Sequence, residues 1–410
     1  MDEYVADLHV HSRYAYACSK SLTLSSIAET AKLKGVQVLS TGDFTHPAWL
    51  AELEAGLEEV DYGTYMHGGV NFVLGTEVSC VFRQGGRTRR IHLLVYLTSF
   101  ESVRRFAGAL EGRGARLESD GRPTARISAS DLTGLTLELD PAAMIIPAHI
   151  WTPWYGILGS VSGFDSLEEC FGEAAHLVSA VETGLSSDPA MNWAISELDC
   201  RAIVSFSDAH SLPNLGREST AFHGQPTYAG LKEAILQNRI AHTVEFYPEE
   251  GKYHYDGHRK CGVSQSPHQT LQCADALCSV CGRPMTLGVL NRVLSLAHEQ
   301  LPAVGPQIQP GEDGLIRHPA DRPPFLRLVP LAELLGETLG AGPKTKTVQK
   351  VYRRLCDELG SELDVLARAG ELDLIQVAGE PVAEAILKAR RGQVSIEAGF
   401  DGRYGTVHVL

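Results

Sequence analysis

Between Val5 and about His242, short apolar runs alternate with amphipathic stretches that have the helical period. The runs that we expect to form strands are Val5–Val10, Val36–Ser40, Val70–Glu77, Ile91–Leu97, Met144–Pro147, Val178–Glu182 and Ala202–Ser207. The stretches that we expect to form helices are Leu24–Lys34, Pro47–Val60, Glu101–Leu110, Pro189–Leu198 and Tyr228–Gln237. This alternation favours an α/β fold with a parallel sheet and crossover helices, and about seven such units predict a barrel.

The remaining segments have other patterns. Residues 112–140 are polar and rich in Gly and Arg, which indicates a long insertion or flap. Further helices are expected at Leu287–His298, Leu331–Leu339, Thr347–Leu359, Glu362–Ala369 and Val382–Arg391, and a hairpin at Val394–Val409. We therefore expect a barrel domain (1–245), a zinc-binding region (246–298), a Pro-rich linker or strap (299–330) and a mainly helical C-terminal domain that ends in the hairpin (331–410).

Composition narrows the class of protein. The 410 residues are 44% apolar and 21% charged, which is typical of a folded chain, and the sequence has no apolar run long enough to span a membrane. The acidic first residues lack the pattern of a secretory signal, so we expect a cytoplasmic protein. With 36 basic and 50 acidic side chains, the net charge is −14, which argues against bulk attraction of a polyanion. A local basic groove or bound cations would reverse that charge where it matters.

Potential metal ligands stand at or near the end of almost every expected strand. His9 and His11 are two residues apart, so they project from the same side of a strand. The other candidates are Asp43, Glu77, His92, His149, Asp208 and His210. In a barrel, these strand ends converge on the face where active sites lie. At about four ligands per ion, the set suits two or three divalent ions, with Zn or Mn favoured by the imidazoles, and hydrolysis of phosphate esters.

Residues 5–242 resemble a PHP (polymerase and histidinol phosphatase) domain. The matching strings are DLHVHS, GDFTHP, GTE, the HLL strand, PAH and SDAH. The resemblance implies a distorted (β/α)7 barrel whose eight candidates ligate a trinuclear site, with His9, His11, Glu77, Asp208 and His210 catalytic. Many PHP proteins have a further His or Asp shortly after H-x-H and a T-D-H string, where this chain has Tyr14–Cys18 and Gly42-Asp43-Phe44. His46 either compensates as a ligand or contacts substrate.

Longer strings resemble the endonuclease Q family over almost the whole chain. They are GDFTHPAWL, VETGLSSDPAMNW, GKYHYDGHRKC and RPPFLRLVPLAEL. The resemblance implies a DNA repair endonuclease that nicks 5′ to deaminated bases (uracil, hypoxanthine, xanthine) and abasic sites, with Zn, Mn or Mg in its PHP site. Members of that family can work with a sliding clamp, but we find no clamp-binding motif near the C-terminus and expect no such partner.

A cysteine cluster in the zinc-binding region indicates a second metal site. Cys278 and Cys281 form a C-x-x-C knuckle, and no strand–helix context of a redox motif surrounds it. Soft ligands across about 30 residues fit one structural zinc. We expect Cys261, Cys273, Cys278 and Cys281 as ligands. His258 and His254 are the alternatives to Cys273.

Several other residues are candidates for contacts with substrate. Trp151, Trp154 and Tyr155 follow the candidate ligand His149, and they either stack on a base or abasic gap, or cap the barrel. Glu182 and Ser187 follow the sixth strand. They suit a role in hydrogen bonding to substrate or in supporting the metal ligands, and the Ser186–Asp188 string equally suits a helix N-cap before Pro189.

Two groups of arginines stand out in an acidic chain. They are Arg83, Arg87, Arg89 and Arg90, and, in the insertion, Arg113, Arg116, Arg122 and Arg126. Each group is either a phosphate clamp or ordinary surface charge.

The sequence therefore predicts a metal-dependent DNA endonuclease. The alternatives are a small-molecule PHP phosphatase and a catalytically silent DNA-binding scaffold. A phosphatase function would not explain the zinc-binding region and the C-terminal domain. The near-complete set of metal ligands argues against a catalytically silent scaffold. The oligomeric state does not follow from the sequence.

Overall fold

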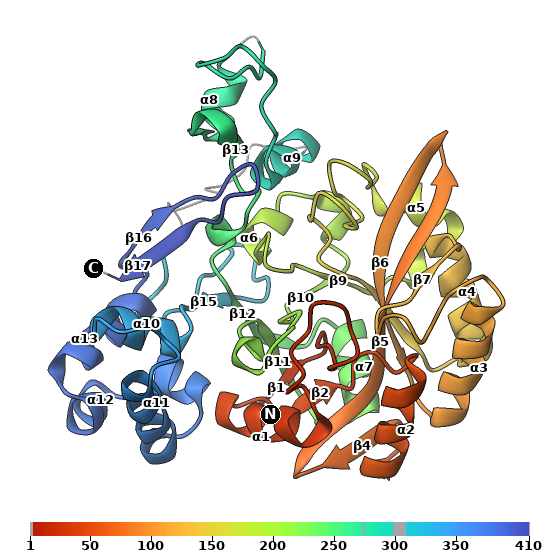
Figure 1. The fold of residues 1–410 in the computed structure, drawn as a ribbon, viewed down its shortest axis with the longest axis horizontal. Coiled ribbons are helices and arrows are strands. Elements are labelled where there is room, and N and C mark those ends of the chain that lie inside the picture. The colour runs from red at the N-terminus through yellow and green to blue at the C-terminus, as the bar shows by residue number, and fades with distance from the viewer. Residues whose placement is uncertain (1–2, 274, 298–308, 410) are drawn as a thin grey trace. The chain divides into compact units, whose positions relative to one another are not determined.

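The computed structural model describes residues 3–273, 275–297 and 309–409 (Figure 1). They form two compact units. The first unit contains residues 3–32, 36–184 and 196–243, and the second contains residues 33–35, 185–195 and the described residues from 244 on. The expected division into four regions is finer and stays a prediction. Part of the expected linker, residues 299–308, lies outside the described residues.

The first unit is built on one large mixed sheet. Its strands are β1 (Glu3–Asp7), β2 (Val38–Ser40), β3 (Glu58–Asp61), β4 (Thr64–His67), β5 (Val70–Gln84), β6 (Arg87–Leu97), β7 (Thr124–Ala125), β8 (Met144–Pro147), β11 (Ser219–His223) and β12 (Ile240–Glu245, which ends in the second unit). The central order is β12-β11-β1-β2-β5, and β6 joins β5 to β8. β1, β2 and β5 are parallel, whereas β11, β6 and β8 pair antiparallel with their neighbours.

A separate parallel pair, β9 (Ala180–Glu182) and β10 (Ala202–Val204), lies beside this sheet. Backbone contacts just beyond the strands join the pair to the sheet on both sides. Ile150 N, just after β8, donates to Glu182 O over 3.1 Å, and Val10, just after β1, forms an isolated parallel bridge with Ala209. The mixed α/β class expected from the alternating pattern is confirmed.

The strand β5 is longer than the sequence pattern indicates. Val70–Glu77 was expected, but the strand continues to Gln84. The strand β6 pairs with it antiparallel from Leu74 to Gln84. β2 pairs with β5 only as far as Val73. Glu77 therefore lies inside β5, four residues beyond the last residue that pairs with the parallel strand β2.

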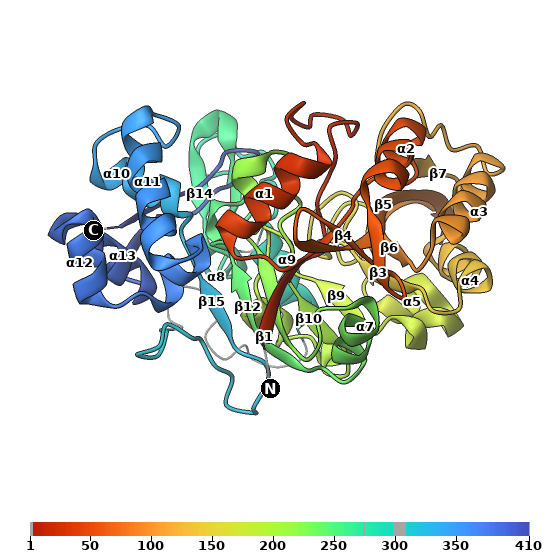
Figure 2. The ribbon, with the colours of Figure 1, turned by 90° about the horizontal axis from the view of Figure 1, so that it is seen from below.

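Helices cover the first unit. They are α1 (Leu24–Lys34, which ends in the second unit), α2 (Pro47–Gly56), α3 (Phe100–Glu111), α4 (Ala129–Leu139), α5 (Leu167–Phe171) and α7 (Tyr228–Leu236). α3 and α4 lie together on one side of the β5–β6 hairpin in both views (Figures 1 and 2). The core between helices and strands includes Leu8, Val73, Phe206 and Leu231, which are all buried. The expected insertion thus contains a packed helix, α4, as well as a loop.

The second unit holds the remaining elements. They are α6 (Pro189–Asn192), β13 (Asp256–His258), β14 (Val263–Gln265), α8 (Pro267–Leu271), α9 (Val289–Leu296), β15 (Phe325–Arg327), α10 (Leu331–Thr338), α11 (Lys346–Leu359), α12 (Glu371–Ala378), α13 (Glu380–Arg390), β16 (Val394–Glu397) and β17 (Thr406–Val409). Helices α10 to α13 gather into one group in both views, around a core that includes Leu335, Leu355 and Ile386 (Figures 1 and 2). Among the described residues, no helix is long and apolar enough to cross a membrane.

Candidate metal centre and cysteine–histidine cluster

Seven of the eight expected ligands come together in the first unit. They form three groups, and within each group the potential ligand atoms lie within 4.8 Å of one another. The groups are His9, His11 and Glu77; Glu77, His92 and His149; and His11, Asp208 and His210. These side chains come from strands far apart in the sequence, so the expected convergence at the strand ends is present.

The carboxylate of Glu77 joins the first two groups. Its Oε2 atom lies 3.7 Å from His9 Nε2 and 3.5 Å from His11 Nε2. Its Oε1 atom lies 3.0 Å from His149 Nε2 and also contacts His92 Nδ1. Asp208 Oδ1 stands on the H-x-H side, 3.5 Å from His9 Nε2 and 3.1 Å from His11 Nε2. One carboxylate thus faces two sets of imidazoles with one oxygen each, which is the arrangement of a bridging ligand.

Glu182 fixes the orientation of His9. The Nδ1–H group of His9 donates to Glu182 Oε1 over 2.9 Å, and the backbone N–H of His149 donates to Glu182 Oε2 over 2.6 Å. Glu182 is fully buried, so it acts on the imidazoles and not at the surface. A carboxylate on one ring nitrogen leaves the other nitrogen as a free electron-pair donor toward the centre.

Asp43 does the same for His11, and its assignment as a metal ligand stays a prediction. Its Oδ1 accepts from His11 Nδ1 over 2.9 Å, and its Oδ2 accepts from the backbone N–H of Ser12 over 2.6 Å. Both oxygens are therefore engaged, and Asp43 belongs to none of the ligand groups found among the described residues. From sequence alone, a carboxylate at a strand end looks the same whether it touches a metal or an imidazole.

The centre fits metal ions because it is largely buried and one of its imidazole donor atoms has no hydrogen-bond partner among the described residues. His9 Nε2 is buried and forms no hydrogen bond with any described residue. Burial opposes the charged form of His9, but the carboxylates of Glu182 and Asp208 outweigh it and raise its pKa well above the usual value, so the ring holds a proton that a bound cation would replace. Burial lowers the pKa of His92 to about 4 despite the nearby Glu77, which keeps this imidazole in the neutral form that binds metals. A buried cluster of this kind is the chemistry that divalent cations satisfy.

The backbone is strained at the same place. Asp43, His149 and Asp208 have φ values of 49°, 31° and 45°, a region that side-chain-bearing residues rarely adopt. Such conformations cluster where the surrounding structure holds functional groups in position.

Arg122 is the cationic side chain of the centre. Its Nη1 lies 3.2 Å from Glu77 Oε2, and the attraction of that carboxylate raises its pKa further above the usual value. The loop that carries it is tied to the H-x-H segment, because Gly121 N donates to Tyr14 O over 3.2 Å. Gly121 also lies against Asp43, where a Cβ atom would come within 2.5 Å of the Asp43 carboxyl carbon.

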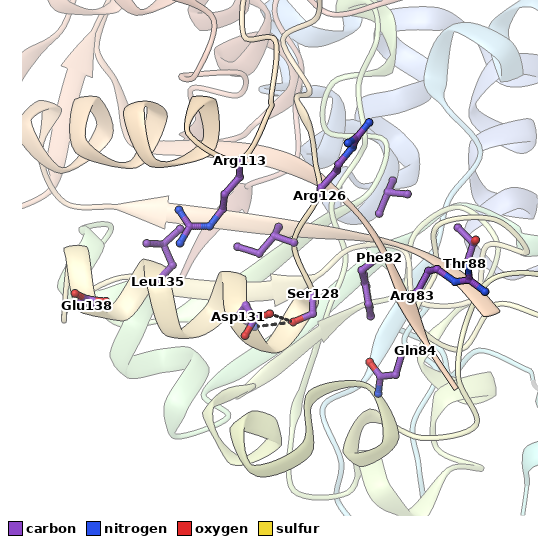
Figure 3. Close-up of a pocket in the computed structure, with 12 residues that line it drawn as sticks. Phe82, Arg83, Gln84, Thr88, Arg113, Arg126, Ser128, Asp131, Leu135 and Glu138 are labelled. Carbon is purple, nitrogen blue, oxygen red and sulfur yellow. Dashed lines mark hydrogen bonds between the residues drawn. The ribbon is translucent and has the colours of Figure 1, made fainter. Parts of the chain in front are cut away.

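The other arginines have different surroundings. Arg89 is buried, contacts the Gly163 carbonyl and lies over the ring of Phe164, so its role is structural. Arg83, Arg113 and Arg126 line an open pocket of about 790 Å³ beside β5 and α4 (Figure 3). In Figure 3 their guanidinium groups point in different directions. A phosphate clamp needs donors that converge on one point, so this pocket lacks the geometry of a built anion site.

The expected substrate-contacting residues divide by exposure. His46 is buried and stacks on Tyr14 at 4.5 Å between ring centroids, outside the ligand groups found among the described residues. Trp151 is fully buried, which favours the capping role, whereas Trp154 is 40% exposed and open to contact. Tyr155 lies 4.3 Å from the ring of His92 and accepts the His92 backbone N–H through its carbonyl.

Two residues differ from expectation in place or role. Ser187 belongs to the second unit, where it is buried and accepts a hydrogen bond from Asn192 Nδ2 over 3.2 Å. Thr152, which the sequence reasoning missed, hydrogen-bonds through its hydroxyl with His149 Nδ1 over 2.9 Å. The only signal for Thr152 is its position three residues after a candidate ligand.

The second metal candidate lies in the second unit and corrects one ligand. Potential ligand atoms of His258, Cys261, Cys278 and Cys281 lie within 4.8 Å of one another. The expected Cys273 is exposed and elsewhere, with its thiol 3.4 Å from the Gln269 carbonyl. His258, the last residue of β13, joins the cluster instead. The tight turn between β13 and β14 folds the chain back and brings Cys261 close to His258.

Two similar turns build this cluster. The H-x-x-C turn is followed by Gly262 and the C-x-x-C turn by Gly282, and both glycines have a φ of 68°. That left-handed conformation lets the backbone fold back toward the ligands without a steric penalty. Burial opposes ionisation of the Cys278 thiol, but backbone N–H groups of Val280 and Cys281 lower its pKa to about 6. Cys278 therefore has the thiolate character that zinc prefers, whereas the hydrogen bond with Cys281 raises the pKa of the Cys261 thiol to about 11.

The fold and these two sites define a class: mixed α/β proteins with a buried histidine–carboxylate centre that suits metal binding. Residues 330–393 match the family model of the MJ0043 C-terminal domain. The chain is 29% identical to the uncharacterised protein YqxK of Bacillus subtilis (strain 168), over 99% of this chain and 100% of YqxK.

Two solved structures extend the likeness to the whole chain. The lesion-specific endonuclease PfuEndoQ from Pyrococcus furiosus is 32% identical, with a TM-score of 0.85 and coverage of 100% of this chain and 96% of that one. A complex of endonuclease Q with a 27-mer duplex, which has an abasic lesion at the active site, matches with the same identity and TM-score over 97% of its chain. The chain belongs to the endonuclease Q family.

Proposed function

We propose that this protein is a metal-dependent DNA repair endonuclease that cleaves the phosphodiester bond 5′ to deaminated bases (uracil, hypoxanthine, xanthine) and abasic sites. The observation that carries the proposal is the Glu77 carboxylate facing two imidazole groups in a member of the endonuclease Q family. The surrounding strands form a PHP-type distorted barrel, in which the backbone contacts beside β9 and β10 complete the ring.

The side chains have distinct roles in this proposal. His9, His11 and Glu77, with Asp208 beside them, would hold one divalent ion, and Glu77, His92 and His149 would hold a second. When bound, such ions supply a hydroxide near neutral pH and stabilise charge on the phosphate. Glu182 and Asp43 keep the His9 and His11 rings aimed at the centre, and Asp208, whose side chain is 26% exposed, faces the solvent side from which DNA approaches. His258, Cys261, Cys278 and Cys281 hold one structural zinc in the second unit.

The products follow from where the bond breaks. An oxygen from water joins the phosphorus, and the bond from phosphorus to the 3′ oxygen breaks. The strand is left with a 3′-OH and with a 5′-phosphate on the lesion nucleotide, whose damaged base stays attached. Turning the lesion out of the stack costs least where base pairing is already weakened.

One assay separates this function from its rivals. The protein is incubated with Mn or Mg and with end-labelled duplexes that carry a single uracil, hypoxanthine or abasic site, beside a small phosphate ester. We expect a nick immediately 5′ of the lesion. Turnover of the ester alone would favour a phosphatase, and binding without cleavage would favour a silent scaffold.

The variant Asp208→Ala tests the centre itself. Because it removes a ligand and not a core side chain, we expect cleavage to fall below about a thousandth of the wild-type rate while the circular dichroism spectrum stays the same. Cleavage at the wild-type rate would contradict the assignment of Asp208 as a ligand.

A further inference from the structure

The third ligand group overlaps the first. It consists of His11, Asp208 and His210, and His11 also belongs to the first group. Asp208 Oδ1 lies 3.5 Å from His9 Nε2, so this carboxylate faces the first group as well. The Nδ1 of His11 is held by Asp43, so its Nε2 is the ring nitrogen directed at the centre. The donors of the two groups therefore lie side by side.

Arg122 places a positive charge beside these ligand groups. Its guanidinium lies 3.2 Å from the oxygen of Glu77 that faces the H-x-H pair, and its electrostatic influence extends to Asp208 and His210. The side chain is 25% exposed, so its cationic end is reachable from solvent while one edge contacts the centre. An arginine carries its charge at any working pH and offers several N–H donors in one plane.

The Arg122 backbone is anchored on both sides. Asp120 Oδ1 accepts from the backbone N–H groups of Tyr16 and Arg122 over 3.0 and 3.1 Å. The next residue, Pro123, accepts from Ser79 N over 2.9 Å, two positions along β5 from Glu77. This loop thus holds Arg122 between the H-x-H segment and the strand that carries Glu77.

We propose that Arg122 is a catalytic residue that donates to a non-bridging oxygen of the phosphate to be cut. The inference rests on the proposed endonuclease function. As the new phosphorus–oxygen bond forms and the bond to the 3′ oxygen breaks, negative charge on the non-bridging oxygens must be stabilised. Arg122 is fixed beside that position before the reaction begins.

The test compares Arg122→Gln and Arg122→Lys with a matched control. Arg104→Gln removes a similar arginine–glutamate pair, in which Nη2 lies 2.7 Å from Glu54 Oε1, but this pair is exposed and contains no candidate ligand. Single-turnover cleavage of a duplex with one abasic site is measured at saturating Mn. We expect the Gln variant to be about 100-fold slower or more, the Lys variant to recover part of the loss, and the control to equal the wild type.

Mn binding, measured by calorimetry without DNA, separates this role from support of Glu77. If Arg122 contacts the phosphate, the Gln variant binds Mn at least as tightly as the wild type, because a competitor for Glu77 Oε2 is gone. An unchanged cleavage rate, or a loss that excess Mn restores together with weakened Mn binding, would overturn the proposal.

Failure of the endonuclease function itself gives a different result. If the wild type cleaves no lesion duplex, the proposed function is wrong, and binding of the Mn-loaded protein to the abasic duplex decides the role of Arg122. A slope of log affinity against log salt that is smaller by about one unit in the Gln variant supports the phosphate contact. Equal slopes and affinities overturn it.

Discussion

At the scale of single residues, the centre depends on carboxylates that differ in what they touch. Glu77 presents one oxygen to each of two imidazole groups, whereas Glu182 and Asp43 bind the far nitrogens of His9 and His11. Imidazole rings whose outer nitrogen is already hydrogen-bonded need not reorient when a cation binds. Part of the entropic cost of metal binding is therefore already met in the folded protein.

Glu182→Gln tests this support directly. The two Glu182 oxygens accept from His9 Nδ1 and from the His149 backbone N–H. The amide of the variant has only one oxygen, so its NH2 group would face one of these two N–H groups and could not accept from it. We expect Mn affinity, measured by calorimetry, to fall by about 10- to 100-fold.

The exposed Glu54→Gln is the control and leaves Mn affinity unchanged. Loss of DNA affinity with intact Mn affinity would show instead that Glu182 contacts the substrate, as the sequence alone left open.

Residue types at strand ends were predictable, but their partners were not. The spacing of His9 and His11, and the strings that end in His149 and Asp208, indicated convergence because a parallel arrangement brings strand ends together. Whether a carboxylate such as Asp43 faces a metal or an imidazole depends on a shift of a few ångströms. Sequence spacing carries no information at that resolution.

At the scale of elements, the cysteine–histidine cluster shows how turns select ligands. His258 ends β13 and Cys261 ends the tight turn that follows, while Cys273 lies beyond the next helix, α8. From the sequence, Cys273 was the expected fourth ligand, with His258 and His254 as alternatives. The backbone selects His258 because the H-x-x-C turn repeats the geometry of the C-x-x-C turn.

The element-scale prediction contrasts two cysteines. Cys281→Ser removes a cluster member, so we expect loss of bound zinc and a drop of more than about 4 kcal/mol in the free energy of unfolding of the second unit. Cys273→Ser should retain zinc and stability. Zinc content by atomic absorption and denaturant unfolding check both, and retention of zinc by the Cys281 variant would refute the ligand set.

Some bounds of helices and strands were predicted correctly and others were not. The strand Met144–Pro147 has the expected bounds, whereas the expected helices Pro47–Val60 and Pro189–Leu198 end at Gly56 and Asn192. Leu24–Lys34 has the expected bounds, because an apolar stripe and its polar flanks mark both ends. Strand β5 continues to Gln84 because β6 pairs with it from Leu74 to the end of the strand. That pairing cannot be predicted from the residues of β5 alone. The helix α12 was missed, since its eight residues carry too short a pattern between Gly370 and Gly379.

At the scale of the whole molecule, each unit has its own hydrophobic core and its own metal candidate. A net charge of −14 opposes the approach of a polyanion. Cations bound at the centre would make the local electrostatic potential more positive while changing the total charge only slightly.

This division predicts that the two units respond separately to metals. Mn at 100 times its dissociation constant should stabilise the first unit by about 2.7 kcal/mol for each independent site, seen as an upward shift of one calorimetric transition. The Asp208→Ala variant should show a smaller shift. A shift of both transitions together would contradict the separate response.

The bare α-carbon of Gly121 has a wider consequence. The loop can press on Asp43 only because nothing projects from that carbon, and Asp43 in turn holds His11. Even a single methyl group at position 121 would displace the aspartate, tilt the ring and misdirect its lone pair, three steps removed from any contact with the ion. A position with no functional group of its own is therefore as intolerant of change as the ligands themselves.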